Sequence, residues 1–305
     1  MSEKKETEVV EKKRPRGRPR LTPLPPAINK KGVAMTPSGE GNHSELVFDA
    51  PSNFKRAMLL FKAHSPKELH FSFTHSALII SARNHVGTSR VYCKFQGANM
   101  VHYYCREPIS FTLKMKNVAM VVGRIDAKYV TTSIFIQEVS LKQSVQFVFR
   151  NKLGMDENFT IKMITATAAP PPPIEKPNMS LYPIEFTMDS SYFKKFVNDT
   201  FSDSLTISKV GANNQLRFTY ESGDRMISAN LVVKDEEALD LRSAIDGRTI
   251  FSTTLRLEYA APLAKALIGK YINVQVSEKE DILFSGNMSD GAISVTVACQ
   301  IIDLS

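Results

Sequence analysis

The chain lacks tryptophan, long apolar runs and paired cysteines. Cys93, Cys105 and Cys299 form an odd, sparse set without a Cys-x-x-Cys spacing, which favours reduced thiols in a reducing compartment. No window approaches the roughly 20 apolar residues that span a bilayer, and the charged N-terminus has no apolar signal core. These absences predict a soluble, intracellular protein that does not engage membranes.

Catalytic and metal-binding motifs are also missing. The chain has no phosphate-binding glycine loop, no Gly-x-Ser-x-Gly and no His-Glu-x-x-His, and its six histidines lack zinc spacing. The acidic run 235–237 fits a solvated turn better than an acid/base pair. We therefore expect a binding protein without cofactor or metal, and an enzyme is the less favoured alternative.

The apolar content is sufficient for two folded domains. A chain of 305 residues, 43% of them hydrophobic, suits about two domains of ordinary size. The net charge of +8 is unevenly spread, because residues 1–43 carry ten Lys/Arg and five Glu. The remainder is nearly balanced, so nucleic-acid contacts there would depend on where the charges lie.

Residues 1–43 are expected to form a disordered basic arm, because they combine charge, proline and glycine without an apolar period. The arm contains Arg-Gly-Arg-Pro, which resembles an AT-hook and is thin enough for the minor groove of A·T tracts. Three interpretations remain open: a DNA-contacting arm, a nuclear-import signal or a solubilising tail. The arginines concerned are Arg14, Arg16, Arg18 and Arg20.

A proline-rich connector at 168–183 separates two segments of similar length, 44–167 and 184–305. Its run of four prolines cannot continue a helix or donate backbone hydrogen bonds to a sheet, which favours an extended spacer. Both segments show an α+β pattern of strands with two short helices. In the first, strands are expected at 45–48, 67–75, 77–82, 89–95, 109–113, 128–137, 143–150 and 158–167, with helices from Pro51 and Met115. In the second, strands are expected at 184–188, 204–209, 215–220, 225–233, 251–257, 271–277, 281–286 and 292–301, with helices around Phe193 and at 261–268.

The two segments also share residues. When 112–130 is placed on 254–272 without a gap, apolar positions coincide and Lys128-Tyr129 meets Lys270-Tyr271. Chance explains some apolar matches, but the paired Lys-Tyr at one offset favours an internal duplication.

Basic residues lie on or beside the non-core side of all four expected helices. For one helix this is ordinary, since surface helices usually carry lysine. The shared trend favours contacts to phosphates, which need no sequence preference and weaken as salt rises. The candidate DNA-binding residues are Lys55, Arg56, Lys62, Lys116, Arg124, Lys194, Lys195, Lys265 and Lys270.

These stretches resemble the sliding clamps of the proliferating cell nuclear antigen type. Residues 49–62 are similar to the first helix of those clamps, 191–199 to the third and 259–265 to the fourth. The connector occupies the place of their interdomain connecting loop. The basic arm and the divergence make the clamps of large double-stranded DNA viruses the more similar group. The chain departs from the clamp pattern at Met120, Gly123, Asn198 and Cys299.

The resemblance implies two clamp domains per chain and a homotrimeric ring, with the helices lining the hole and the sheets outside. Edge strands near 143–150 of one subunit would pair with those near 225–233 of the next. The ring would encircle duplex DNA, tether DNA polymerase and other replication and repair enzymes for processive synthesis, and be opened by an ATP-dependent clamp loader. It would act in the nucleus or at a cytoplasmic viral replication site.

Proteins that carry a docking peptide would bind the outer face. The residues that the resemblance implies for this docking are Val86, Val91, Ile174, Met179, Leu181, Ala298, Cys299 and Gln300.

Two rival functions stay open. A monomeric or dimeric viral processivity subunit would hold DNA by charge without encircling it. An AT-hook chromatin or transcription protein would use its β-rich body to bind other proteins.

Overall fold

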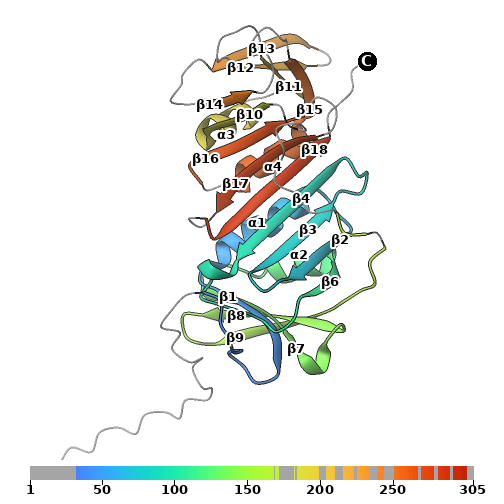
Figure 1. The fold of residues 1–305 in the computed structure, drawn as a ribbon, viewed down its shortest axis with the longest axis vertical. Helices are drawn as coiled ribbons and strands as arrows, with labels where there is room; N and C mark the ends of the chain where they lie inside the picture. The colour runs from blue at the N-terminus through green and yellow to red at the C-terminus, as the bar shows by residue number, and fades with distance from the viewer. Residues whose placement is uncertain are drawn as a thin grey trace, which may run out of the picture.

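In the computed structural model, the described residues form three antiparallel β-sheets and four short α-helices (Figure 1). None of the helices in the described part of the chain has the length and apolar character of a bilayer-crossing segment. The predicted α+β class is confirmed. The structure describes residues 32–167, 169–171, 182, 184–198, 204–209, 216–222, 225–233, 239–243, 251–266, 269–277, 281–288 and 291–300.

Each of the two smaller sheets comes from one half of the chain. The five-stranded sheet has the order β5-β1-β7-β8-β9 and the four-stranded sheet the order β13-β12-β11-β15. The five strands are β1 (Asn42–Phe48), β5 (His102–Cys105), β7 (Tyr129–Gln137), β8 (Ser144–Asn151) and β9 (Asp156–Lys162). The four strands are β11 (Ser204–Lys209), β12 (Leu216–Ser222), β13 (Arg225–Val233) and β15 (Phe251–Arg256).

The third sheet combines strands from both halves in the order β14-β10-β16-β17-β18-β4-β3-β2-β6. The two halves meet where β4 pairs with β18, in a register that runs from Phe95 opposite Ile293 to Ser89 opposite Cys299. The sheet is therefore continuous across the chain. Its strands are β2 (Glu68–Phe73), β3 (Ala77–Arg83), β4 (Ser89–Gln96), β6 (Ile109–Lys114), β10 (Ile184–Asp189), β14 (Leu239–Ser243), β16 (Tyr271–Val276), β17 (Asp281–Met288) and β18 (Ile293–Gln300).

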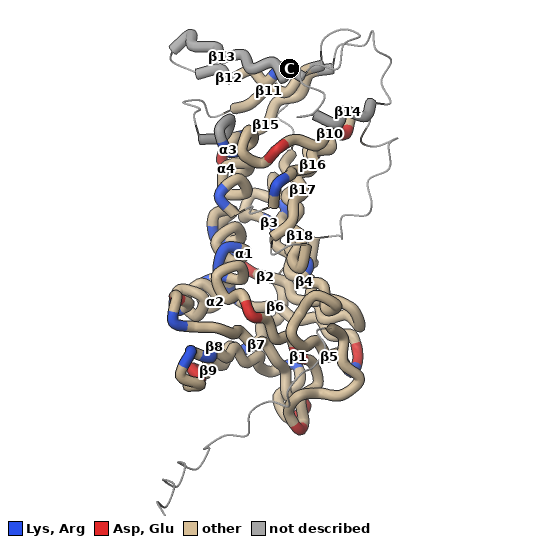
Figure 2. Tube along the Cα trace, turned by 90° about the vertical axis from the view of Figure 1, so that its left-hand side faces the viewer, with Lys and Arg blue, Asp and Glu red and all other residues tan. Residues whose placement is uncertain are grey.

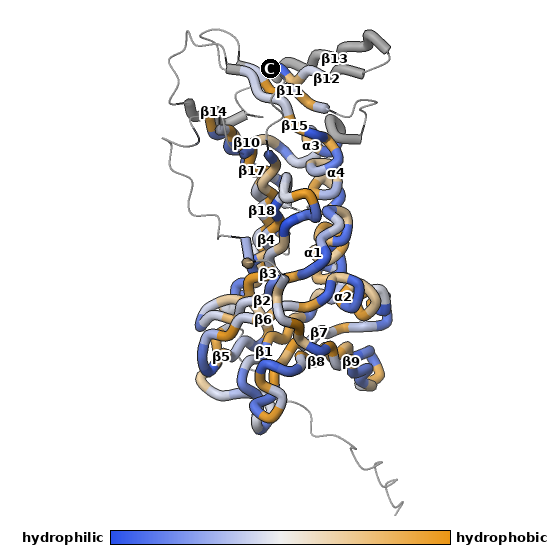
Figure 3. Tube along the Cα trace, turned by 90° about the vertical axis from the view of Figure 1, so that its right-hand side faces the viewer, coloured by the Kyte–Doolittle hydropathy of each residue, from blue (hydrophilic) through white to orange (hydrophobic). Residues whose placement is uncertain are grey.

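The four helices form one row along one side of the molecule, with the nine-stranded sheet on the other side (Figure 2). Neighbouring helices pack in the order α3, α4, α1, α2. Figure 3 shows the same two layers from the opposite side. The helices are α1 (Pro51–Ala63), α2 (Met115–Val122), α3 (Ser190–Asn198) and α4 (Leu257–Ala266).

The apolar stripe of α1 explains why this helix lies against the sheets. Phe54, Ala57, Met58 and Phe61 recur at helical spacing and are all buried. The centroid of the Phe54 ring lies 5.9 Å from that of Phe95 in the nine-stranded sheet. It lies 6.3 Å from the ring centroid of Phe147 in the five-stranded sheet. Burying such a side chain contributes about 2–3 kcal/mol, so α1 is a main connection between two sheets.

The junction of the two halves is reinforced beyond the β4–β18 ladder. Arg90 of β4 forms an ion pair with Asp281 of β17. The Tyr259 hydroxyl of α4 lies 2.8 Å from the Thr88 hydroxyl in the turn before β4. The Tyr259 ring also stacks on His64, with centroids 5.9 Å apart. The two halves of the chain are thus joined both through their helices and through the nine-stranded sheet.

The duplication predicted from sequence has a structural counterpart. Under the same gapless offset, the start of α2 at Met115 coincides with the start of α4 at Leu257. The starts of β7 at Tyr129 and β16 at Tyr271 coincide as well. The strand–helix–strand unit is therefore built twice.

Several predicted boundaries need correction. The segments 102–105 and 239–243 are strands that the sequence pattern did not indicate. The strand expected over 158–167 runs instead as β9 and ends at Lys162. The fourth helix begins before the predicted residue 261, so Pro262 lies inside it rather than in its first turn. The acidic run 235–237 lies outside the described residues.

His64 makes the stability of the junction dependent on pH. It is 4% exposed, and burial lowers its pKa from 6.5 to about 4. Because the unfolded chain takes up this proton more readily, folding stability should fall as the pH drops from about 6.5 towards 4. Between pH 7 and pH 5 the loss should approach about 2 kcal/mol, measured by urea unfolding at one protein concentration.

The variant His64→Gln should lose this part of the pH dependence. His85, which is exposed, provides the control, and His85→Gln should keep it. Equal pH dependence in both variants would show that His64 does not carry the effect.

Candidate nucleic-acid interface

Basic side chains gather along the row of helices. Figure 2 shows Lys and Arg positions on α1, α2 and α4 along the side away from the nine-stranded sheet. On α1, Arg56 and Lys62 are exposed, because the apolar stripe of this helix faces the sheets. These two side chains can reach a ligand that runs along the row.

Lys55 differs from its neighbours. It is half-buried, and its Nζ donates a 2.6 Å hydrogen bond to the Ile125 carbonyl, just beyond α2. This bond satisfies a backbone acceptor near a helix end and ties α1 to α2. Removing Lys55 would disturb the packing of two helices as well as the charge, so it is a poor probe of ligand contacts.

The second helix carries charge only at its ends. Lys116 in its first turn and Arg124 just after it are exposed. Between them Met120 is 69% exposed, and Leu59 on the adjacent α1 is 48% exposed. This part of the row therefore presents apolar surface between basic residues.

In the second half, Lys265 in the last turn of α4 is exposed and Lys194 on α3 is half-buried. The backbone of Lys195 belongs to α3, while its side chain lies outside the described residues. Lys265 and Lys194 extend the basic row over the helices of both halves.

The repeated Lys-Tyr pair adopts the same geometry in both halves. The ammonium of Lys270 lies 4.9 Å from the centre of the Tyr271 ring, and that of Lys128 lies 4.7 Å from the centre of the Tyr129 ring. These are cation–π contacts. The hydrogen bond with Tyr271 raises the pKa of Lys270, while Lys128 also pairs with Glu157 at 3.2 Å. Lys270 is therefore the less neutralised of the two.

The predicted docking residues are only partly at the surface. Val86 is 63% exposed in the turn after β3, and Gln300 is exposed at the end of β18. Val91, Ala298 and Cys299 are each at most 1% exposed. Their side chains therefore face the interior beside the exposed Val86 and Gln300, and their role in partner binding stays a prediction.

Some predicted site residues fall where no structure is described. The connector residues Ile174, Met179 and Leu181 and the arm residues Arg14, Arg16, Arg18 and Arg20 lie outside the described residues.

Two further basic residues lie near this surface without a signal in the sequence. Lys67 and Lys114 are far apart in the chain, but β2 and β6 pair with Glu68 opposite Lys114. The strand register thus brings the backbones of the two lysines near each other, with Lys67 next to Met115. In the part of the chain that the structure describes, no three His, Cys, Asp or Glu side chains converge as a metal site would require.

Comparison with solved structures shows the fold. The chain superposes on proliferating cell nuclear antigen from Entamoeba histolytica with a TM-score of 0.68 and 14% identity, over 86% of this chain and 100% of that one. For the antigen from Thermococcus kodakaraensis the TM-score is 0.69 with 16% identity, over 85% and 100% of the two chains. The predicted clamp fold is confirmed.

Sequence relatives are viral. An uncharacterized protein of African swine fever virus, from the Tick/Malawi isolate, is 21% identical over 284 residues, which is 89% of this chain and 92% of that protein. The protein from the Badajoz strain gives the same identity and coverage. No family model matches the chain.

The exposed residues of the row allow a direct test of DNA contact. We expect the triple variant Arg56→Ala, Lys62→Ala and Lys265→Ala to bind duplex DNA more weakly and with a smaller salt dependence. The slope of log affinity against log salt should fall by about 0.9 for each phosphate that the variant no longer neutralises. Titration of a labelled duplex at several NaCl concentrations measures this slope.

Lys94 provides the control. It is exposed on β4, while its neighbour Phe95 packs against α1, so alternation directs Lys94 to the opposite face of the sheet. Lys94→Ala should leave the slope unchanged. A triple variant that also keeps the wild-type slope would mean that the row does not face DNA.

Proposed function

We propose that this chain is a DNA sliding clamp. Copies of it close head to tail into a ring, the row of helices faces duplex DNA, and the ring tethers a DNA polymerase and other replication or repair enzymes. The observation that carries the proposal is the single nine-stranded sheet with all four helices on one side. The fold shared with proliferating cell nuclear antigen supports it.

Ring closure needs strands that are free to pair. The segment 143–150, expected at the edge, corresponds to β8, which is paired on both sides, so that prediction is wrong. The edge is β9, and β13 is an edge of the four-stranded sheet. We propose that β9 of one subunit pairs with β13 of the next, which would cover two exposed edges.

Two other sheet edges, β5 and β6, are already partly covered within the chain. Val33 forms a bridge with Tyr103 at the outer side of β5. Ile164 forms a second isolated bridge, with Thr112 of β6. These short additions block the outer sides of β5 and β6, whereas no described strand adds to β9 or β13. Among the described strands, β9 and β13 are therefore open to pairing, as are the edge strands β14 and β15.

A ring around DNA does not need tight or sequence-specific contacts. Exposed lysine and arginine side chains on helices bind phosphates regardless of sequence. Topological linkage keeps the protein on the duplex while such contacts form and break during sliding. Encirclement also requires an opening step, for which we propose an ATP-dependent clamp loader.

Partners are proposed to dock on the sheet side, away from the DNA. Val86 and Gln300 are the exposed residues of the predicted docking set. They lie close together, because the Gln300 amide donates a 2.9 Å hydrogen bond to the Thr88 carbonyl in the same turn as Val86. Peptide segments of polymerases and repair enzymes are the partners proposed for this surface, together with the connector.

The oligomeric state gives a direct prediction. The protein should sediment as a trimer, with three times the chain mass of 34.1 kDa. Because successive N–H groups of a strand point to opposite edges, proline at Asn158 and at Phe159 of β9 should act differently. Proline has no backbone N–H. At one of these two positions the substitution therefore removes a backbone hydrogen bond to β8, and at the other it removes an N–H donor from the free edge of β9. The edge variant should give folded monomers in analytical ultracentrifugation, and trimers from both variants would exclude β9 as the interface.

Retention on DNA tests encirclement itself. After loading, the protein should stay on nicked circular plasmid in moderate salt and slide off the same plasmid once it is linearised. Gel filtration of the DNA-bound fraction measures this. Equal loss from circular and linear DNA would favour a subunit that holds DNA by charge alone. Loss of all binding on deletion of residues 1–43 would favour the chromatin-protein alternative.

A further inference from the structure

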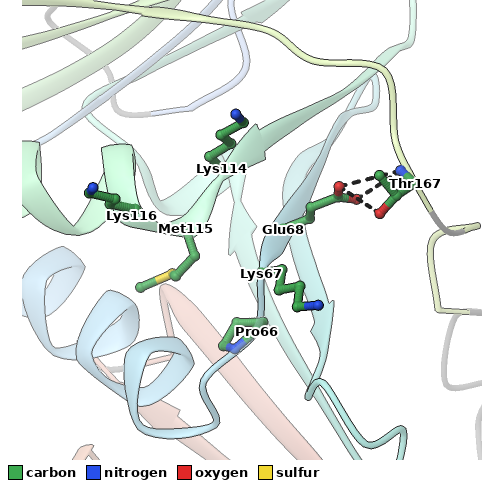
Figure 4. A pocket seen from close by; sticks show the side chains of 7 residues that line it. All are labelled: Pro66, Lys67, Glu68, Lys114, Met115, Lys116 and Thr167. Carbon is green, nitrogen blue, oxygen red and sulfur yellow. Dashed lines mark hydrogen bonds between the residues drawn. The ribbon is translucent and has the colours of Figure 1, made fainter.

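A basic hollow of about 650 Å³ lies at the end of the row of helices, where β2 begins and β6 ends (Figure 4). Three lysines line it, and they come from three different elements. Lys67 closes the connection from α1 to β2, Lys114 is the last residue of β6, and Lys116 lies in the first turn of α2. All three are exposed.

The backbone holds these lysines in place. Glu68 is opposite Lys114 in the β2–β6 register, and the Met115 amide donates a 3.0 Å hydrogen bond to the Lys67 carbonyl. The positions of the three Cα atoms are therefore determined by sheet and helix geometry. Only the flexible side chains need to adjust to a ligand.

The hollow keeps a net positive charge, with three lysines against one carboxylate in its lining. Of the described residues, Glu68 is the only carboxylate that lines it, and it accepts hydrogen bonds from the Thr167 amide at 3.0 Å and the Thr167 hydroxyl at 2.7 Å. Among the described residues, Lys67, Lys114 and Lys116 have no ion-pair partner. Figure 4 shows Glu68 directed towards Thr167 and the three ammonium groups spread apart. Spread lysines suit successive phosphates of a strand better than one small anion.

The hollow adjoins the row of helices. Met115 lines both the hollow and a smaller cavity of about 60 Å³ between α1 and α2, whose walls include Lys55 and Lys62. A polyanion that follows the row would meet no acidic residue on α1 or α2 before it reached Lys116, Lys114 and Lys67.

The second half of the chain provides an internal comparison. Under the offset that aligns α2 with α4, Lys114 corresponds to Arg256 and Lys116 to Glu258. Arg256 and Glu258 form an ion pair with each other at 3.6 Å. Among the described residues, the second half thus has a neutral pair where the first half has the two lysines Lys114 and Lys116.

We propose that Lys67, Lys114 and Lys116 hold the phosphate backbone of the duplex where it leaves the row of helices. This contact rests on the proposed clamp function and adds an asymmetric element to it. Within each subunit, the first half attracts the strand at the rim of the opening and the second half does not.

The test compares salt dependence in matched variants of the full-length protein. The double variant Lys67→Ala/Lys114→Ala should lower the slope of log affinity against log NaCl for a labelled duplex by about 0.9 for each phosphate left without its lysine. Lys67→Arg/Lys114→Arg should restore the wild-type slope. The control Arg256→Ala/Glu258→Ala removes the neutral pair at the equivalent position and should leave the slope unchanged.

The outcomes separate this proposal from the clamp function. An alanine variant with the wild-type slope overturns the rim contact, even where the wild-type protein stays on circular plasmid and the clamp function holds. Failure of the arginine variant to restore the slope overturns it too, since a charge contact does not require lysine. If the wild-type protein leaves circles and linear DNA equally fast, the clamp function fails, while a reduced slope on short duplex still supports the phosphate contact.

Discussion

The pairing of β4 with β18 is the interaction on which the rest of the molecule depends. Seven residues of β4, from Ser89 to Phe95, are registered against β18, and this ladder joins two sheets into one of nine strands. Without it, α1 and α4 would belong to separate bodies and the row of helices would break in its middle. The Tyr259 contacts to Thr88 and His64 act at the same junction. The ladder therefore sets the relative position of all the basic residues on the helices.

The rigidity of the row of helices lowers the entropic cost of lysine–phosphate contacts. Exposed lysines that move independently bind phosphates at an entropic cost, whereas lysines on helices fixed to one sheet keep a constant spacing along a polyanion. The hydrogen bond from Lys55 to the Ile125 carbonyl illustrates a second use of the same residue type. It fixes α2 against α1 and so positions Lys116, although Lys55 itself is half-buried.

Sequence patterns predict the parts of this structure that local periodicity determines. The stripe of Phe54, Ala57, Met58 and Phe61 identifies α1, and the repeated Lys-Tyr pair identifies the duplicated unit. Strands β5 and β14 are short and owe their conformation to pairing with β1 and β10, so no local pattern indicates them. The burial of Val91, Ala298 and Cys299 depends on a pairing between distant segments, as does the position of Glu68 opposite Lys114. Such features depend on register, which a single sequence does not specify.

The duplicated unit shows which properties the fold constrains and which it leaves free. Lys128 and Lys270 keep the same contact with the following tyrosine, and α2 and α4 begin at equivalent positions. The charges just before and within the first turn of these helices differ, with two lysines in one half and an Arg–Glu pair in the other. These residues are exposed, so core packing does not determine which side chain stands there. A ring of three subunits would thus have six similar units in shape but only three basic rims. The duplex would meet an alternating field around the opening, and its preferred position would be set by charge rather than by the symmetry of the fold.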